Sequence, residues 1–180
     1  EHTGYRYGRN VNRISMIINP ARYLLKRYYA SDLRSNELKW ILNLWFPFIV
    51  NRIKIISITE DFHTINVRLK HSFWNQNPNK SIWGGSITSA LDPFFPIMMK
   101  QLLLKRGIIT DFYSKAVNVK FLKMIKTNVT FHFSISEEEV TIAEKKLDQN
   151  GKYDGWHSID GIDSEGYICV NGRVQVYLKR

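Results

Sequence analysis

The fold and the candidate site are indicated most clearly by the segment Asn75-Gln-Asn-Pro-Asn-Lys-Ser-Ile-Trp-Gly-Gly-Ser-Ile-Thr-Ser-Ala-Leu-Asp92. A polar, asparagine-rich turn leads into Gly84 and Gly85, and the glycines begin an apolar helix that carries one carboxylate, Asp92. The first backbone N–H groups of a helix have no partner within it, and glycine lets another molecule approach them closely. The segment is therefore typical of a site that holds a carbonyl oxygen as it becomes negative, with an acidic group nearby.

The helix that begins at this segment is predicted to run from about Gly85 to Lys105. Its apolar residues surround the axis, so we expect the helix to be buried as the core around which strands pack. These residues are Ile87, Ala90, Leu91, Phe94, Phe95, Ile97, Met98, Met99, Leu102, Leu103 and Leu104.

Alternating apolar residues predict strands on both sides of this helix. Two strands precede it as a hairpin, within residues 53–58 and 65–70. The predicted strands that follow are 116–124, 128–136, 140–147, 156–162 and 167–178. The turn Asp148-Gln-Asn-Gly151 is interpreted as a hairpin connection. This order predicts an α+β protein in which a curved antiparallel sheet wraps around a long central helix, the hotdog fold, rather than a Rossmann arrangement of alternating strands and helices.

Residues 1–50 are predicted to form an N-terminal tail and helices, ahead of a hotdog domain in residues 51–180. The spacing of apolar and aromatic residues between Tyr23 and Tyr28 indicates one helix, and Ser35 is expected to cap a second one that ends at Pro47. The basic, aromatic stretch 22–29 fits a helix on a membrane surface, although packing on its own domain is the commoner arrangement.

Composition limits the partners that the chain can have. The 26 Lys and Arg residues outnumber the 16 Asp and Glu, and the resulting formal charge of +10 favours a polyanionic partner or simply aids solubility. No nucleic-acid-binding motif is recognisable, so nucleic acid is not expected as a partner. The longest apolar run, residues 40–50, is too short to span a bilayer.

The thiol and imidazole groups give no indication of a metal or cofactor. The single cysteine, Cys169, excludes an intramolecular disulfide, and a buried, reduced thiol suits a cytoplasmic protein. Four histidines lie far apart without metal-ligand spacing, and each is expected to be solvated or at an interface: His63, His71, His132 and His157.

The glycine segment also resembles a known family. The pattern Asn77-x-x-x-Ser81-x-Trp83-Gly84-Gly85, followed by Ser-Ala-Leu-Asp92-Pro93, is similar to the central motif of the hotdog acyl-CoA thioesterases, and most similar to a poorly characterised branch described as a domain of unknown function. Supporting segments are Asn43-Leu-Trp-Phe-Pro-Phe48 and Val174-Gln-Val-Tyr-Leu-Lys179. The resemblance covers roughly residues 38–179.

The resemblance implies a homodimer, or a dimer of dimers, with acyl-CoA sites at the subunit interface and a role in lipid metabolism. The amide that polarises the thioester carbonyl maps to Gly84 or Gly85, the catalytic carboxylate to Asp92, and the upstream asparagine of the motif to Asn77. In the phenylacetyl-CoA type of member a histidine usually precedes the glycine pair. Trp83 stands here instead, where its ring can form the floor of an acyl pocket and its indole N–H can donate.

Helix geometry independently favours a site shared between two copies. Asp92 lies seven residues beyond Gly85, which is about 10.5 Å along a continuous helix at roughly 1.5 Å per residue. A carboxylate cannot act on a carbonyl held at its own helix N-terminus over that distance, so two antiparallel helices from two copies are required. Two alternatives remain open: Asp92 can pair with a buried Lys or Arg, and Asn77 can simply build the turn.

The predicted function is therefore hydrolysis of acyl-CoA thioesters, with water activated by Asp92. The alternative is a non-catalytic module that binds an acyl group or lipid, which the replacement of the usual histidine by Trp83 motivates. The residues predicted to bind the substrate are Trp83, Ser86, Phe94, Phe95 and Met98. Four lysines are candidates for contacting the CoA phosphates or for protecting a strand edge: Lys115, Lys120, Lys123 and Lys126.

Overall fold

The computed structural model describes residues 33–180, so the helix predicted around residues 23–28 lies outside the described part. The strands are β1 (Ile53–Ile58), β2 (Thr64–Leu69), β3 (Asp111–Phe121), β4 (Val129–Ser134), β5 (Lys152–Asp163) and β6 (Ile168–Lys179). The helices are α2 (Ser35–Asn43), α3 (Phe46–Asn51), the 3-10 turn η2 (Phe73–Asn75), α4 (Gly84–Ser89), α5 (Phe94–Lys105) and α6 (Glu137–Asn150).

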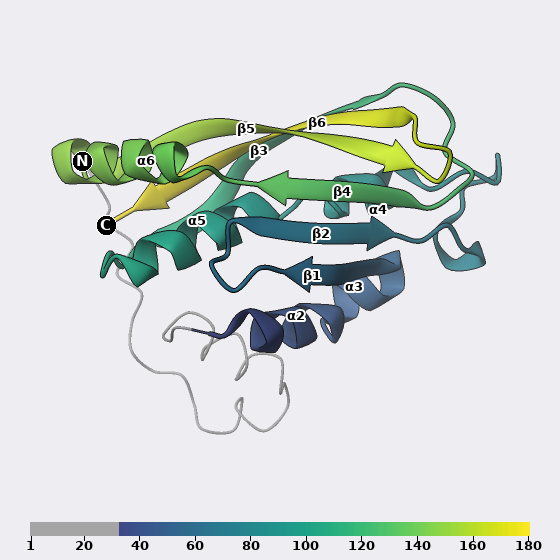
Figure 1. The fold of residues 1–180 in the computed structure, drawn as a ribbon. Coiled ribbons are helices and arrows are strands. Elements are labelled where there is room, and N and C mark those ends of the chain that lie inside the picture. Colours follow the sequence, from purple (N-terminus) through teal and green to yellow (C-terminus); the bar gives the residue numbers. More distant parts are fainter. Residues whose placement is uncertain (1–32) are drawn as a thin grey trace, which may run out of the picture. The chain divides into compact units, whose positions relative to one another are not determined.

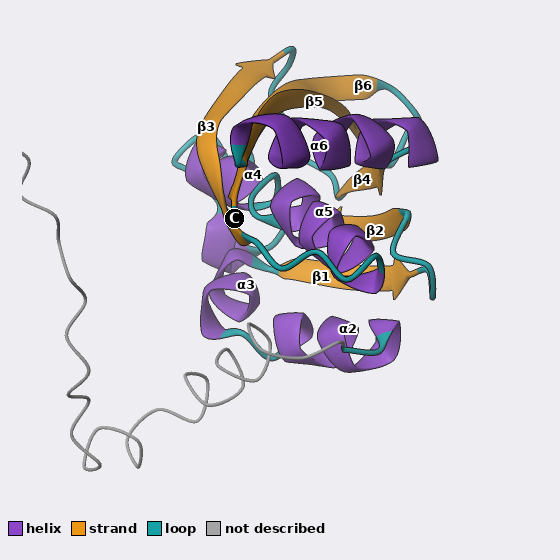
Figure 2. Ribbon diagram, turned by 90° about the vertical axis from the view of Figure 1, so that its left-hand side faces the viewer, coloured by secondary structure: helices purple, strands orange, loops and turns teal. Residues whose placement is uncertain are grey.

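The six strands form one antiparallel sheet in the order β1-β2-β4-β5-β6-β3. Figure 1 shows the strands side by side, and Figure 2 shows the sheet curving around α5. The predicted α+β hotdog fold is confirmed. Helix α5 is the core element, because every residue from Phe94 to Leu103 is buried. The Phe94 ring lies 4.8 Å from Phe133 of β4 and 5.5 Å from Phe48 of α3.

The predicted helix 85–105 is two helices, with a break at residues 90–93. Proline lacks a backbone N–H and disfavours a helical conformation in the residue before it, so Asp92 and Pro93 lie in the break between the two helices. The second proline, Pro96, falls in the first turn of α5, where backbone N–H groups have no helical partner in any case. The break lets Asp92 leave the helix surface and approach the sheet.

The strand predicted at 140–147 is wrong, since α6 occupies this segment. Ser136 and Glu139 cap the helix reciprocally: the Glu139 N–H donates to Ser136 Oγ at 3.2 Å, and the Ser136 N–H donates to Glu139 Oε2 at 2.7 Å. Gly151 ends the helix with φ +67° and does not form a hairpin. The apolar residues that suggested a strand form the buried face of the helix at spacings of three and four: Val140, Ala143 and Leu147.

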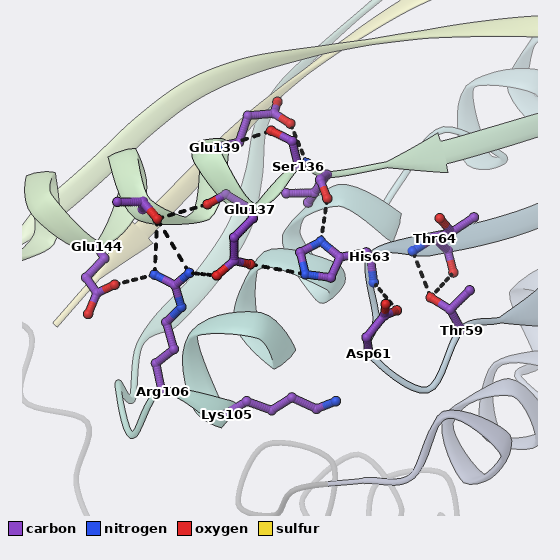
Figure 3. Close-up of polar contacts among 12 residues, drawn as sticks. Thr59, Asp61, His63, Thr64, Lys105, Arg106, Ser136, Glu137, Glu139 and Glu144 are labelled. Carbon is purple, nitrogen blue, oxygen red and sulfur yellow. Dashed lines mark hydrogen bonds and ion pairs between the residues drawn. The ribbon is translucent and has the colours of Figure 1, made fainter.

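Polar contacts hold the first turn of α6 to the rest of the fold. Arg106, directly after α5, donates hydrogen bonds to Glu137 and Glu144 of α6. His63, directly before β2, places Nε2 3.3 Å from the Glu137 carboxylate and Nδ1 2.6 Å from the Ile135 carbonyl oxygen. Figure 3 shows His63 and Arg106 approaching Glu137 from opposite sides. Exposed ion pairs of this kind contribute little individually, but together they position α6 beside the end of α5.

The β1 edge of the sheet is covered by α2. The Asn43 side chain accepts a hydrogen bond from the Ile55 N–H at 2.8 Å and donates one to the Ile55 carbonyl at 3.0 Å, as a neighbouring strand would. The predicted limits of this helix are corrected: Arg34 is the N-cap, Ser35 is the first helical residue, and Pro47 lies in the first turn of α3. Proline is accommodated there because that N–H needs no helical partner.

Strand β3 forms the opposite edge of the sheet. Among the described strands β3 pairs with β6 alone, and a bulge at Lys115 shifts its register between Ser114 and Ala116. None of its residues is fully buried, not even the inward-facing Val117 and Val119. An uncovered edge strand with a half-exposed apolar face is suited to pairing with another chain.

Candidate active site

The glycine pair presents two backbone donors. Trp83 is the N-cap of α4, with φ −60° and ψ 133°, and Gly84 is the first helical residue. The Trp83 carbonyl accepts from the Ser86 N–H at 3.0 Å, which sets the first turn. Within residues 33–180, neither the Gly84 nor the Gly85 N–H donates a hydrogen bond. Because α4 has only six residues, we attribute the donor capacity to these two N–H groups and not to a helix dipole.

Aromatic rings surround the glycines. A Cβ on Gly84 would lie 3.3 Å from the ring of Phe121, at the end of β3. A Cβ on Gly85 would lie 2.4 Å from the Trp83 ring, so no side chain fits there without moving the indole. Trp83 is 56% exposed and Phe121 is 51% exposed. The two N–H groups therefore lie beside an apolar surface that is open to another molecule.

Asp92 contacts the other half of β3. It is half-buried in the break between α4 and α5, where Ser114 Oγ donates a hydrogen bond to its Oδ1. Ser114 and Phe121 are seven residues apart, which corresponds to about 20 Å along a strand at roughly 3.3 Å per residue once the bulged Lys115 is left out. Asp92 and Gly84 of one copy thus lie beside β3 at points far from each other.

Two predicted polar residues already have local partners. The Asn77 side-chain oxygen accepts from the Asn79 N–H at 2.9 Å, the Ser81 N–H at 3.2 Å and the Ser81 hydroxyl at 3.1 Å. Asn77 therefore builds the turn before the glycines. Ser86 is buried, and its hydroxyl donates to Asn51 Oδ1 at 2.7 Å, which ties α4 to α3.

The aromatic and sulfur-containing residues predicted to bind the acyl chain are in the core of the chain. Phe94, Phe95 and Met98 are at most 1% exposed. The Phe95 ring stacks on His157 at 5.0 Å. Of the predicted apolar lining, only Trp83 is open to solvent, and it lies beside the glycine pair.

The lysines near β3 divide into two groups. Lys115 is paired with Asp154 at 2.6 Å, and its hydrogen bond lowers the pKa of that carboxyl group. Lys123 is paired with Asp163. Lys120 and Lys126 make no ion pair within residues 33–180. These two lysines are therefore the ones available to a phosphate group.

Three residues near the candidate site were missed by sequence reasoning. Phe121 was predicted to share an apolar strand face, but its contact with Gly84 needed the sheet register. Ser114 carried no signal, because its contact with Asp92 depends on the bulge at Lys115. Lys100 is buried in α5 against Phe112 of β3, with Nζ 5.2 Å from the ring centroid, and burial lowers its pKa to about 8. A charged residue in an apolar helix was the available signal for Lys100.

Other classes of site have little support in the described part. Among residues 33–180 no group of three or more His, Cys, Asp or Glu side chains is arranged to hold a metal ion. No described helix is both long enough and apolar enough to cross a membrane. His157 is buried, contrary to the expectation of a solvated or interface histidine, and the Tyr153 hydroxyl lies 3.2 Å from its Nε2.

The antiparallel sheet that wraps around α5 (Figure 2) defines a hotdog fold. The chain belongs to the family described as Domain of unknown function (DUF4442), whose sequence profile matches residues 35–178. No curated protein sequence matches the chain.

Solved structures with the same fold include proteins described as thioesterases. A Pseudomonas aeruginosa protein described as a probable thioesterase has a TM-score of 0.68 and 13% identity over 83% of this chain and 99% of its own. A Haemophilus influenzae thioesterase has a TM-score of 0.59 and 13% identity, over 84% and 94%. The Escherichia coli PaaI protein from the phenylacetic acid degradation operon has a TM-score of 0.55 and 16% identity, over 77% and 87%. At these identities the likeness establishes the fold.

Proposed function

We propose that this protein hydrolyses acyl-CoA thioesters at sites that two copies form together. The observation that carries the proposal is the arrangement on β3. Gly84, whose N–H has no partner among the described residues, lies beside Phe121 at one end of this edge strand, and Ser114 holds the Asp92 carboxylate toward the other end. Within one copy, the glycine end of β3 lacks the Asp92 carboxylate, and the Asp92 end lacks the backbone donors of the glycines. The fold that the chain shares with proteins described as thioesterases supports the same reaction class.

Antiparallel pairing of the β3 strands of two copies brings the glycine donors of one copy next to the Asp92 carboxylate of the other. A two-fold axis at Asn118 sets Asn118 opposite its own copy and Ala116 opposite Lys120 of the partner copy. The bulge takes up Lys115, so Ser114 comes opposite Phe121 of the partner copy. Directly opposed residues in an antiparallel pair point to the same face, and both of these side chains point inward. Asp92 of one copy therefore lies next to the partner's glycine pair.

The chemistry follows from this arrangement. The N–H of Gly84 or Gly85 donates to the thioester carbonyl oxygen and stabilises its developing negative charge. Asp92 takes a proton from a water molecule, whose oxygen bonds to the carbonyl carbon. The carbon–sulfur bond then breaks, the acid is released, and the CoA thiolate receives a proton. Asn77 completes the site by fixing the turn that carries the donors.

The surroundings indicate the substrate class. Trp83 and Phe121 offer an apolar surface to a medium or long acyl chain, and Lys120 and Lys126 are available to the CoA phosphates. The free, buried thiol of Cys169 suits a reducing compartment, and on this basis we place the activity in the cytoplasm.

Turnover of a panel of acyl-CoA thioesters by the wild type, Asp92→Asn and Asp92→Ala tests the proposal. Asparagine retains an acceptor for Ser114 but cannot take a proton, so kcat should fall by at least about 100-fold in both variants. Asp160→Asn, an exposed change on β5, is the matched control and should turn over like the wild type. Equal turnover by the wild type and both Asp92 variants would remove Asp92 from the chemistry.

The second candidate function is binding of an acyl group or lipid without hydrolysis. One observation favours it: the Trp83 ring lies where a side chain on Gly85 would be and so covers that side of the glycine. Native mass spectrometry that finds a retained acyl ligand, together with no hydrolysis of any thioester in the panel, would select this function. Replacement of Trp83 by His would then be the informative variant, because it removes the indole from this position and introduces the histidine that usually precedes the glycine pair.

A further inference from the structure

A second exposed apolar face lies on the segments next to β1, at the other edge of the sheet from β3. Its residues come from α2, α3 and η2, and α3 packs against both of its neighbours. The most exposed are Phe73 at 87%, Trp74 at 77% and Phe46 at 73%. The apolar face as defined here consists of Trp40, Leu44, Phe46, Ile49, Phe73 and Trp74. Single exposed apolar residues are common, but several of them on neighbouring elements are typical of an interaction surface.

A cationic groove adjoins this face. Its volume is about 340 Å³, and Trp40 and Ile49 belong to both the groove and the apolar face. The charged side chains that line it are all positive, with no carboxylate among the lining residues: Lys39, Arg52, Lys54 and Lys70. The buried Nε of Arg52 has no hydrogen-bond partner among the described residues. The positive charges and the Arg52 Nε donor make the groove suited to binding an anionic group.

The register of the sheet adds to the positive charge. Lys54 of β1 lies directly opposite Arg68 of β2, and the Lys70 N–H donates to the Arg52 carbonyl one step further along. Like charges placed directly opposite each other destabilise a sheet. The concentration of cations here thus costs stability in the isolated chain, and an anionic partner would offset that cost.

We propose that the apolar face and the cationic groove together dock this protein on an anionic phospholipid membrane. Tryptophan, phenylalanine and leucine side chains enter the boundary between headgroups and acyl chains, while neighbouring Lys and Arg contact lipid phosphates. The two requirements are met side by side on α2, α3 and the start of β1. Figure 1 shows α2 and α3 lying along the β1 edge of the sheet. The proposal does not depend on the thioesterase function, which concerns β3.

Charge argues against other occupants of this surface. Residues 1–32 contain six Lys and Arg but only Glu1 and Asp32 as acids, so this segment would be repelled by the groove. A second copy would bring the same cations against themselves. The phosphates of a nucleic acid could pair with the cations of the groove. The aliphatic side chains of Leu44 and Ile49, however, cannot stack on bases.

Vesicle co-sedimentation with the full chain tests the proposal. The probes are phosphatidylcholine vesicles with and without about 30 mol% phosphatidylserine. The wild type should sediment with the anionic vesicles, and raising the salt from about 0.1 M to about 0.5 M should weaken this binding. The tryptophan fluorescence of the chain, to which Trp74 contributes as one of five tryptophans, should shift to shorter wavelength on binding and be quenched by brominated lipid.

Paired variants distinguish binding by the apolar face and the groove from a general effect of net charge or exposed apolar residues. Phe73→Ala with Trp74→Ala should weaken binding at least tenfold, whereas Ile109→Ala with Tyr167→Ala, also exposed, should not. Lys54→Glu with Lys70→Glu should weaken binding by more than about 25-fold, at about fivefold for each charge. Lys145→Glu with Lys179→Glu changes the net charge equally and should have a much smaller effect.

Several outcomes would overturn the proposal. Failure of the wild type to bind anionic vesicles would do so, as would equal losses in the face variants and their controls. Binding of an RNA oligonucleotide that Lys54→Glu with Lys70→Glu abolishes, without vesicle binding, would assign the groove to nucleic acid instead. A concentration-dependent increase in mass that Phe73→Ala with Trp74→Ala abolishes, without vesicle binding, would assign the face to self-association.

Discussion

The two edge strands of the six-stranded sheet differ in whether another element covers them. At the β1 edge, Asn43 of α2 makes both hydrogen bonds to Ile55 that a neighbouring strand would make, and the helix covers the strand. At the β3 edge no described strand or helix does the equivalent, although β3 is eleven residues long. A long uncovered edge invites pairing with another chain, and proteins usually protect such edges. Within residues 33–180 only the β1 edge is covered, and the candidate site lies at the other edge.

The largest expected effect is recovery of activity from two inactive copies. Asp92→Asn and Gly84→Pro should each abolish most turnover, since one removes the base and the other removes a donor. A heterodimer of the two variants, purified through two different tags, retains one intact site of two. It should show about half of the wild-type turnover per dimer, as expected for a two-fold interface with two equivalent sites. Activity no greater than that of the separate variants would mean that β3 does not join the halves.

The next effect isolates the backbone donor at Gly84. Proline is tolerated at the first position of a helix, and the extended conformation of Trp83 suits a residue that precedes proline. Gly84→Pro therefore removes the N–H with little change in the fold, and kcat should fall by about 100-fold. Gly84→Ala keeps the N–H and adds only a methyl group near Phe121, so it should lose less than about threefold. Equal losses in the two variants would indicate a steric effect rather than a lost donor.

At the closed edge the expected change is in stability and not in assembly. Asn43→Ala leaves the Ile55 N–H and carbonyl without partners and should lower the free energy of unfolding by about 2 kcal/mol. Asn66→Ala removes a more exposed amide on β2 and should cost less than about 0.5 kcal/mol. Chemical denaturation measures both values. The oligomeric mass of Asn43→Ala should equal that of the wild type; a change in mass would show that the β1 edge also takes part in assembly.

The smallest expected effect concerns the middle of the sheet, which belongs to neither edge. Burial lowers the pKa of His157 below its ordinary value of 6.5, with Glu139 3.1 Å from Nδ1 acting in the opposite direction. The unfolded chain therefore binds the proton more readily, so stability that is present above pH 6.5 is lost as pH falls through the folded-state pKa.

Denaturation midpoints measured between about pH 7 and about pH 5 should show this loss, amounting to less than about 1 kcal/mol, in the wild type. His157→Gln should lack this contribution to the pH dependence. An unchanged pH profile in His157→Gln would assign the dependence to other groups.

Much of the fold could be predicted from local patterns. The alternation in 53–58, 65–70 and 128–136, and the apolar residues all around α5, identified the strands and the core correctly. The strand predicted at 140–147 failed because Val140, Ala143 and Leu147 were interpreted without the capping box at Ser136. The break at Pro93 was also missed, since two prolines were treated as compatible with one continuous helix.

The candidate site was less predictable, because its contacts cross the sheet. Gly84, Gly85 and Asp92 were identified from the sequence, and Trp83 does lie beside the glycines. Phe94, Phe95 and Met98 were expected to line a pocket but are core residues, since an apolar pattern cannot separate a pocket wall from a core. The contacts of Ser114 and Phe121 depend on the register of β3 and its bulge, which local sequence does not specify.

Disulfide cross-linking of Asn118→Cys tests the pairing of two β3 strands most directly. Opposed residues in an antiparallel pair have Cα atoms about 4.5–5.5 Å apart, which suits a disulfide. Mild oxidation should convert Asn118→Cys almost completely to a linked dimer of about twice the 21.2 kDa chain mass, while Thr130→Cys, exposed on the central strand β4, should stay unlinked. A wild type that sediments as a monomer, with Asn118→Cys linking no faster than Thr130→Cys, would contradict the account.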